Sequence, residues 1–274
     1  MTKKEKGYIG IFDSGVGGLT IFKDIVKTLP KYSYIYLADS AKAPYGDKPQ
    51  KLIYSLTKKA VGFLFKKNCE LIILACNTAS SQALRKIQRD FLPKNYPQKR
   101  VLGIIIPTAE EIIAKEKPRK VGVIATNATI KSKAFVKEIK KINSQIIILQ
   151  KACPSLVPII EAGKENSKKA TEALKKCLNP LLEKNINTLV LGCTHYILLK
   201  EKIKKIAGPR VKIVSGEKIV AEKLKEYLRR HPEIESKLDK SGKKVIYTTE
   251  ENNKFNKLIS KLFKRGVKIA KTNL

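Results

Sequence analysis

The octet LIILACNT, residues 71–78, is matched 117 positions later by the octet TLVLGCTH, residues 188–195. Each octet begins with an apolar run typical of a buried β-strand. A small residue, a cysteine and polar residues that could begin a helix then follow. The dipeptide Lys-Asn is separated by two residues from the start of each octet. This repetition predicts two copies of one structural unit, with one thiol, Cys76 or Cys193, at the end of a strand in each copy.

A second pair of segments extends the repeat: GIFDS, residues 10–14, matches GVIAT, residues 122–126, at an offset of 112. Short apolar runs alternate with amphipathic segments along the chain, which is typical of an α/β fold with parallel sheets. Helices are expected in the gaps, most clearly over residues 51–66, 167–184 and 218–230. Strands are expected at residues 8–12, 34–38, 71–75, 101–105, 121–125, 146–150, 189–192, 211–214 and 244–248.

The alternation and the repeat together predict two pseudo-symmetric α/β lobes with mainly parallel sheets. We expect residues 1–102 and 211–274 to form the first lobe, which carries Cys76. We expect residues 103–210 to form the second lobe, which carries Cys193. The return of the C-terminal segment to the first lobe is a topological inference, because the repeat itself does not extend that far.

The bulk composition narrows the class of protein. A chain of 274 residues can bury a substantial core. No apolar stretch reaches the roughly 18 residues of a membrane span, and the N-terminus has no apolar leader, so the expected location is the cytoplasm. An odd number of cysteines, five, without an export signal favours reduced thiols over a disulfide framework. No metal site is expected, because there is no Cys-x-x-Cys motif and the two histidines, His195 and His231, lack ligand spacing.

The formal net charge of +33 raises the hypothesis of a nucleic-acid-binding protein. The excess is nearly all lysine, however, and it is spread over every expected helix instead of forming one basic arm. The sequence also has no zinc-finger or RNP motif. We therefore interpret the lysines as a solvated surface that could help to gather an anionic substrate, and we do not expect nucleic acid binding as the main function.

Four segments carry polar side chains where an expected strand ends and a helix begins. Open parallel sheets bind ligands beyond the carboxyl ends of their strands. Backbone N–H groups and hydroxyls at such turns suit a carboxylate, and a helix N-terminus lowers the pKa of a cysteine toward neutrality. The segments are Asp13-Ser14-Gly15, Pro44-Tyr45-Gly46, Cys76-Asn77-Thr78 and Cys193-Thr194-His195.

These segments resemble the motifs of bacterial glutamate racemase, a member of the aspartate/glutamate racemase family. The resemblance runs in the family's order from Gly10 to about Leu199, and Tyr247-Thr248-Thr249 resembles a later motif. One such segment would be weak support, but five in order are specific. The five are Ile11-Phe12-Asp13-Ser14-Gly15-Val16-Gly17-Gly18-Leu19, Ala43-Pro44-Tyr45-Gly46, Ala75-Cys76-Asn77-Thr78-Ala79-Ser80, Cys153-Pro154 with Val157-Pro158 and Glu161, and Leu191-Gly192-Cys193-Thr194-His195-Tyr196.

The resemblance implies a cofactor-independent isomerase that interconverts L- and D-glutamate in a cleft between its lobes and supplies D-glutamate for peptidoglycan. It also implies a homodimer. In this sequence Cys76 and Cys193 match the two acid/base thiols, Asp13 the acid beside the first, and His195 and Glu161 the groups near the second. The positions that match the family's substrate-binding residues are Asp13, Ser14, Tyr45, Gly46, Asn77, Thr78, Thr194 and His195.

Two opposed thiols suit the exchange of a proton at a carbon atom. The α-proton of an amino acid is very weakly acidic, so a base must contact it and the developing carbanion needs stabilisation. One thiolate would remove the proton from one face while the opposite thiol protonates the other face. Reversing the direction exchanges the two roles, which explains why each lobe would carry one thiol.

Two other enzyme hypotheses stay open. The nearer one is a racemase of the same superfamily that acts on aspartate or another amino acid. The other is a cysteine hydrolase in which Cys193 is the nucleophile and His195 is its base. That hypothesis leaves Cys76 without a role, and it requires an unusual geometry for two residues so close in sequence.

The remaining residues with reactive side chains are interpreted as structural or left undecided. Cys69, Cys153 and Cys177 are expected to be structural, since buried cysteines behave as small apolar residues. The run of residues 15–18, Gly-Val-Gly-Gly, lacks the spacing of a nucleotide-binding loop and is interpreted as a tight strand-to-helix turn. Asp39 ends an expected strand and could cap the next turn or support a neighbouring residue.

Overall fold

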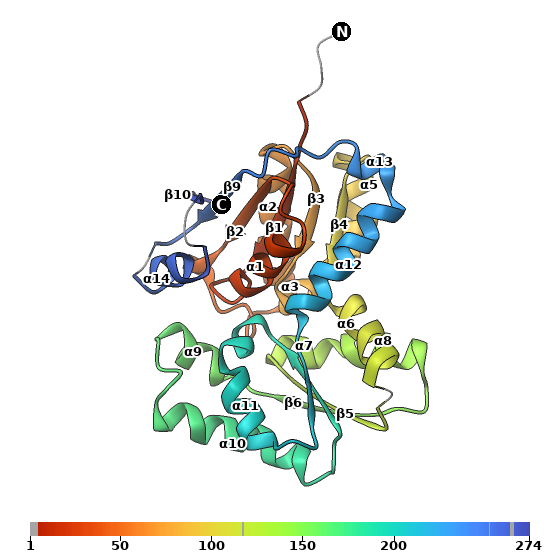
Figure 1. The fold of residues 1–274 in the computed structure, drawn as a ribbon, viewed down its shortest axis with the longest axis vertical. Coiled ribbons are helices and arrows are strands. Elements are labelled where there is room, and N and C mark those ends of the chain that lie inside the picture. The colour runs from red at the N-terminus through yellow and green to blue at the C-terminus, as the bar shows by residue number, and fades with distance from the viewer. Residues whose placement is uncertain (1–4, 117, 252, 264–265) are drawn as a thin grey trace.

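The computed structural model describes residues 5–116, 118–251, 253–263 and 266–274 and has two sheets, one in each half of the molecule (Figure 1). The strands are β1 (Tyr8–Asp13), β2 (Tyr34–Ala38), β3 (Cys69–Leu74), β4 (Arg100–Gly103), β5 (Lys120–Ala125), β6 (Ile147–Ala152), β7 (Thr188–Gly192), β8 (Lys212–Val214), β9 (Lys244–Thr248) and β10 (Lys268–Lys271). The first sheet has the order β10-β9-β2-β1-β3-β4 and the second β6-β5-β7-β8. All the described strand pairs are parallel, which confirms the predicted α/β fold with two lobes.

Helices connect the strands. Short 3-10 and π segments occur beside the α-helices: η1 (Ser40–Lys42), η2 (Ile87–Phe91), η3 (Ile112–Glu116) and η4 (Thr194–Leu199). The α-helices are α1 (Leu19–Thr28), α2 (Gln50–Lys66), α3 (Asn77–Gln82), α4 (Leu84–Lys86), α5 (Leu92–Asn95), α6 (Ile105–Glu111), α7 (Asn127–Ser132), α8 (Ala134–Ile142), α9 (Leu156–Glu161), α10 (Lys168–Leu182), α11 (Lys200–Ala207), α12 (Gly216–Arg230), α13 (Pro232–Glu235) and α14 (Asn253–Leu262).

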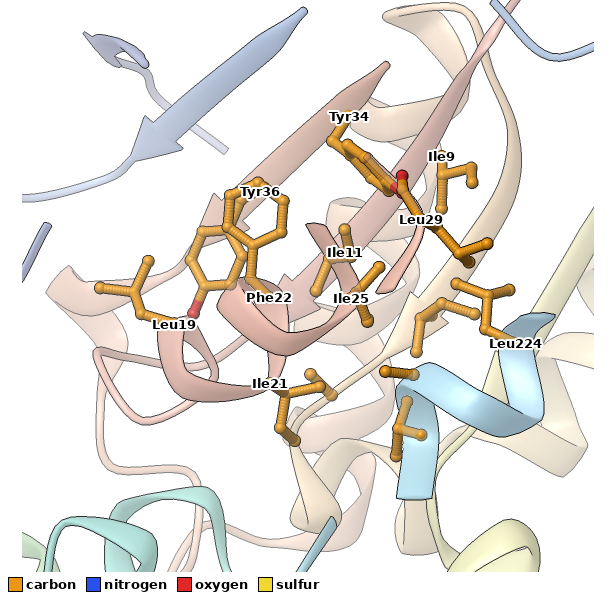
Figure 2. Packing of buried hydrophobic residues seen from close by; sticks show 14 of the residues in the cluster. Ile9, Ile11, Leu19, Ile21, Phe22, Ile25, Leu29, Tyr34, Tyr36 and Leu224 are labelled. Atoms are coloured by element: carbon orange, nitrogen blue, oxygen red, sulfur yellow. The ribbon is translucent and has the colours of Figure 1, made fainter. Parts of the chain in front are cut away.

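The first sheet is covered by helices on both faces. The strands of a parallel sheet that is covered on both faces are apolar nearly throughout. Accordingly, every residue of β2 is buried. On the face covered by α1 and α12, Phe22 stacks on Tyr36 with ring centroids 5.4 Å apart (Figure 2). Helix α2 covers the opposite face. Successive side chains of β3 point to opposite faces of the sheet. Ile73 packs in the core beneath α1, and Ile72 packs in the core beneath α2.

The second sheet is built in the same way. Helices α9, α10 and α11 pack on one face around Leu189 of β7, and α6 and α8 pack on the other face around Val190. The edge strand β6 is less covered, and Ile147 is 50% exposed. Each lobe is therefore a three-layer α/β unit, and the two lobes are alike, as the repeat predicts.

The chain passes between the lobes at two places. After β4 it enters α6, which packs on the second sheet, and after β8 it enters α12, which packs on the first (Figure 1). Strand β8 pairs with β7, and Lys212 lies opposite Thr188. Residues 212–214 therefore lie in the second sheet, whereas the sequence-based boundary put residues 211–274 in the first lobe. The chain completes the second sheet before it returns, and the division into two domains otherwise stays a prediction.

Strand β10 was not expected from the sequence. Its four residues, Lys-Ile-Ala-Lys, contain only two apolar side chains, which is too short a run to predict a strand. The strand pairs with β9 and extends the first sheet at its edge.

The cysteines divide into one bonded pair and three free thiols. Cys153 and Cys177 form a disulfide, so the expectation of reduced thiols is wrong for this pair. Both side chains belong to the core between the second sheet and α10, which brings their Cα atoms to 5.9 Å. Cys69, Cys76 and Cys193 are free and buried.

No helix in the described parts of the chain is both long enough and apolar enough to cross a membrane. Residues 1–4, on which the absence of an apolar leader partly depended, lie outside the described residues.

Candidate active site

The predicted site residues gather at the carboxyl ends of strands from both sheets. Asp13 is the last residue of β1, Cys76 lies just beyond β3, and Cys193 directly follows β7. The carboxyl ends of parallel strands share one edge of a sheet, which is where such folds bind ligands. A hydrogen bond from Thr194 to Asp13 joins the two edges, so the edges face each other.

The site is enclosed. Of the predicted residues, all are buried except Glu161, whose side chain is 25% exposed. Electrostatic interactions are stronger in such a site than in water. Asn77 is buried at the start of α3, but no hydrogen bond within the described residues ties its side chain to another predicted site residue.

Cys76 is a buried thiol with two weak hydrogen-bond partners. Its Sγ lies 3.4 Å from Ser14 Oγ and accepts a hydrogen bond from the backbone N–H of Ala79 at 3.5 Å. Burial and, next, the charge of Asp13 raise the pKa of Cys76 to about 12. The expectation that a helix N-terminus would bring this pKa toward neutrality is therefore wrong for Cys76, because burial has the larger effect.

Asp13 lies at the centre of the site and is completely buried. Its Oδ1 accepts the N–H of Gly15 at 2.9 Å, and its Oδ2 accepts the hydroxyl of Thr194 at 3.1 Å. Burial raises the pKa of Asp13 to about 6, although the charge of His195 and these hydrogen bonds act in the opposite direction. A carboxyl group with this pKa can exchange protons near neutral pH.

Cys193 forms a relay with His195 and Glu161. The Sγ of Cys193 lies 3.8 Å from His195 Nδ1, and His195 Nε2 is in close hydrogen-bond contact with Glu161 Oε1. Burial lowers the pKa of His195, but its hydrogen bonds to Cys193 and Glu161 outweigh that effect and raise the pKa to about 10. The second thiol therefore has a proton-carrying partner of its own, and that partner is oriented by a carboxylate.

The glycine-rich turn after β1 packs directly against this relay. A Cβ atom added at Gly15 would lie 2.7 Å from Glu161 Oε1, and one at Gly17 would lie 2.6 Å from both the backbone N of His195 and Thr194 Oγ1. Only glycine allows the two loops to approach so closely. The sequence indicates a tight turn here, and the structure adds this contact between the lobes.

Threonine hydroxyls form a second link between the lobes. Thr78 Oγ1 lies 2.9 Å from Thr126 Oγ1 and 3.4 Å from Thr129 Oγ1. No sequence motif indicates Thr126 or Thr129 as site residues, although Thr126 is the repeat counterpart of Ser14. Beside them, Gly46 accepts a backbone hydrogen bond from Ala128 at 2.9 Å. The structure thus places the Gly46 loop against the second lobe.

The two thiols are therefore chemically distinct. One has a hydroxyl and a buried carboxyl group nearby, and the other has a histidine held by a carboxylate. Proton-exchanging groups from both lobes therefore lie in one buried site. No cluster of three or more acidic, histidine or cysteine side chains suited to a metal ion occurs within the described ranges.

Fold and site together define an α/β enzyme in which two similar lobes each supply one free thiol to a shared site. The family model described as Asp/Glu/Hydantoin racemase matches residues 9–224. The chain therefore belongs to the Asp/Glu/Hydantoin racemase family, and it is an isomerase.

Individual relatives agree with this assignment over nearly the whole chain. A glutamate racemase from Sulfurihydrogenibium sp. (strain YO3AOP1) is 40% identical over 251 residues, which cover 91% of both chains. The crystal structure of a glutamate racemase isoform from Bacillus anthracis superimposes with a TM-score of 0.88 at 32% identity and covers 98% of both chains. The crystal structure of glutamate racemase from Francisella tularensis in complex with D-glutamate gives 0.85 at 30% identity and covers 98% of this chain and 97% of that one.

Proposed function

We propose that this enzyme interconverts L- and D-glutamate by exchanging the α-proton between two thiols, Cys76 and Cys193. The observation that carries the proposal is that each thiol has its own proton-exchanging partner in one enclosed site: Asp13 beside Cys76 and His195 beside Cys193. The choice of glutamate is supported by the relatives named glutamate racemase and by the D-glutamate complex of the Francisella tularensis enzyme.

The proposed reaction has the same balance of atoms in both directions. A thiolate on one side takes the α-proton and becomes a thiol, while the opposite thiol gives its proton to the other face and becomes a thiolate. Cys76, with a pKa of about 12, enters the cycle as a proton donor. When it must act as the base, Asp13 can take its proton, and His195 can exchange a proton with Cys193.

The substrate would lie between the strand ends, held by groups already near the thiols. Hydroxyls of Ser14, Thr78 and Thr194 and the backbone around Gly46 are candidates to hold the two carboxylates of glutamate. The reaction needs no cofactor, because thiols supply both the base and the acid. We further infer, from the family resemblance, a cytoplasmic homodimer that supplies D-glutamate for peptidoglycan.

The test is incubation with L-glutamate in heavy water without added cofactor. Deuterium at the α-carbon is followed by NMR, and D-glutamate by chiral chromatography. We expect exchange with inversion in the wild-type protein and a loss of inversion by roughly a hundredfold or more in both Cys76→Ser and Cys193→Ser. If a single variant still exchanges the α-proton of only one enantiomer for deuterium, the thiol that this variant retains is assigned to the corresponding face of the α-carbon.

The matched control is Cys69→Ser, because Cys69 is a third free and buried thiol that lies in the first-lobe core. It should retain inversion. Full activity of Cys76→Ser would contradict the two-thiol proposal and favour a reaction at Cys193 alone. Exchange with aspartate but not with glutamate would contradict the proposed substrate.

A further inference from the structure

Asp39 is a completely buried acidic residue that the proposed reaction does not use. Its two carboxylate oxygens have different partners. Oδ2 accepts the hydroxyl of Tyr45 at 2.6 Å, and Oδ1 accepts the hydroxyl of Thr249 at 3.0 Å. A buried carboxylate is costly unless it is hydrogen-bonded, so both contacts matter for its placement.

Thr249 reaches Asp39 because the C-terminal segment returns to the first sheet. Strand β9 pairs with β2, and Thr249 N–H, just beyond β9, donates to the carbonyl of Ala38 at 3.0 Å. The Thr249 hydroxyl also accepts the N–H of Ala41 at 3.0 Å. Since that hydroxyl accepts from Ala41, its own proton is available to Asp39, which fixes the direction of the hydrogen bond.

The hydroxyl of Tyr45 is directed toward Asp39. Burial and then the negative charge of Asp39 raise the pKa of Tyr45, so Tyr45 stays a hydrogen-bond donor. Its ring lies against Phe12 with centroids 6.1 Å apart, and the side chain is 1% exposed. The Tyr45 side chain is therefore held inside the first lobe, where it anchors the loop by its hydrogen bond to Asp39.

The segment beyond this anchor is the part of the loop that meets the second lobe. Gly46 accepts the N–H of Ala128 at 2.9 Å. A Cβ added at Gly46 would lie 2.7 Å from the Cβ of Thr126. A small shift of the Tyr45 anchor would therefore change where the loop backbone lies against the opposite lobe.

We propose that Asp39 is a positioning residue for substrate binding: it holds the Tyr45-Gly46 loop through the Tyr45 hydroxyl, and Thr249 of the C-terminal segment fixes the Asp39 carboxylate. The inference rests on the proposed function, because it takes this loop as part of the glutamate site. It gives a role to two features that have none from the sequence alone, Asp39 and the Tyr247-Thr248-Thr249 motif. It also makes the C-terminal segment a part of the site's support.

The experiment measures kcat and KM for glutamate racemisation in variants of this network. Asp39→Ala and Thr249→Val are expected to raise KM roughly ten- to a hundredfold, while kcat changes much less. Thr249→Ser keeps the hydroxyl and should restore KM to within about twofold of the wild-type value. Thr272→Val makes the same chemical change at a threonine of the C-terminal segment whose hydroxyl donates to the carbonyl of Asn273 and not to Asp39, so it should leave KM unchanged.

A double-mutant cycle tests whether Tyr45 acts through Asp39. Tyr45→Phe should raise KM by about as much as Asp39→Ala, and the double variant should be no worse than the larger single change. Full additivity would mean that the Tyr45 hydroxyl contacts the substrate independently, which would overturn the inference. Unchanged KM, or a loss confined to kcat, in both Asp39→Ala and Thr249→Val would overturn it as well.

Two measurements keep these outcomes interpretable. A thermal melt of each variant identifies loss of folding, and if Asp39→Ala does not fold, the comparison of Thr249→Val with Thr249→Ser decides, because Thr249 is only partly buried. Racemisation of glutamate by the wild-type protein distinguishes a failure of the proposed function from a failure of the proposed role of Asp39. If the wild-type protein does not racemise glutamate, the proposed function fails, whereas a racemising wild type with unaffected variants contradicts only the role of Asp39.

Discussion

Thr194 Oγ1 donates a hydrogen bond to Asp13 Oδ2 at 3.1 Å, although the two residues are 181 positions apart and belong to different lobes. Asp13 is the carboxyl group beside Cys76, and Thr194 directly follows Cys193. This one hydrogen bond therefore connects the surroundings of the two thiols. The charge of His195 acts on Asp13 as well and lowers its pKa. Proton exchange on one side of the site is thus sensitive to the state of the other side.

The pH profile of kcat/KM should fall on its acidic side, and the pKa of Asp13 should set the pH of this acid limb. Burial raises the pKa of Asp13 from 3.8 to about 6, so below that pH the carboxyl group is protonated and cannot take a proton from Cys76. We expect kcat/KM to fall as the pH drops through about 6, as measured by racemisation rates between pH 5 and 9. In Asp13→Asn the rate should be low and this limb absent. A limb that persists in Asp13→Asn would assign it to another group.

Thr194→Val should move that limb to higher pH. The variant removes a hydrogen bond that lowers the pKa of Asp13, so this pKa should rise and kcat/KM should fall by roughly tenfold near pH 7. The measurement is the pH profile of kcat/KM. Thr194→Ser keeps the hydroxyl and is the matched control. If Thr194→Val lost activity without any shift of the limb, the hydrogen bond to Asp13 would not be the cause.

The stability of the protein should depend on Asp13 with a defined sign. Because the pKa of Asp13 is raised in the folded state, its favourable contribution is complete below pH 3.8 and is lost as the pH rises through about 6. Asp13→Asn should therefore stabilise the protein relative to wild type at pH 8 but not at pH 4, by up to about 3 kcal/mol. Thermal melts at the two pH values measure the difference. An equal effect at both would contradict the raised pKa.

Gly17→Ala should separate the lobes locally. The added Cβ would lie 2.6 Å from the backbone N of His195, and backbone cannot move aside as a flexible side chain can. We expect a destabilisation of about 1–3 kcal/mol in chemical denaturation and a large loss of racemisation.

Gly62→Ala is the control for that substitution. Gly62 lies within α2, and its added Cβ would meet nothing within 4 Å, so alanine should stabilise the helix by about 0.5–1 kcal/mol and leave activity unchanged. A Gly17→Ala variant with normal activity would show that the loops can separate without effect on the site.

The number of cysteines that can be alkylated tests whether Cys153 and Cys177 form a disulfide. Alkylation of the denatured protein without reductant, followed by mass spectrometry, should modify three cysteines, namely Cys69, Cys76 and Cys193. The same reaction after reduction should modify five. Five modifications without reductant would instead support the original expectation of reduced thiols throughout the chain.

Much of the fold could be predicted because the signals are local. An apolar run followed by a turn predicts a strand wherever it occurs, and nine of the ten described strands were expected at nearly the observed positions. Strand β10 was missed since its apolar run is too short. The sheet to which residues 212–214 belong could not be predicted, because it depends on where the chain crosses between the lobes.

The sequence predicts the residues of the candidate site that lie in motifs, but it does not predict the contacts between distant residues. The repeat identified Cys76 and Cys193, and the family resemblance added Asp13, His195 and Glu161. The contacts of Thr126 with Thr78, and of Thr249 with Asp39, join residues far apart in the chain. Such contacts have no local pattern, so periodicity and spacing cannot reveal them.

The sequence by itself determined the α/β class and the presence of one strand-end thiol in each of two similar units. Hydrophobic periodicity and internal repetition are properties of the order of residues, so they need no knowledge of the folded structure. The tertiary structure alone decided the chemistry of those thiols. Burial between the lobes raises the pKa of Cys76 to about 12 and that of Asp13 to about 6, whereas an exposed helix N-terminus would have favoured the opposite shift for the thiol. Burial results from both lobes packing together, and no segment carries that information alone.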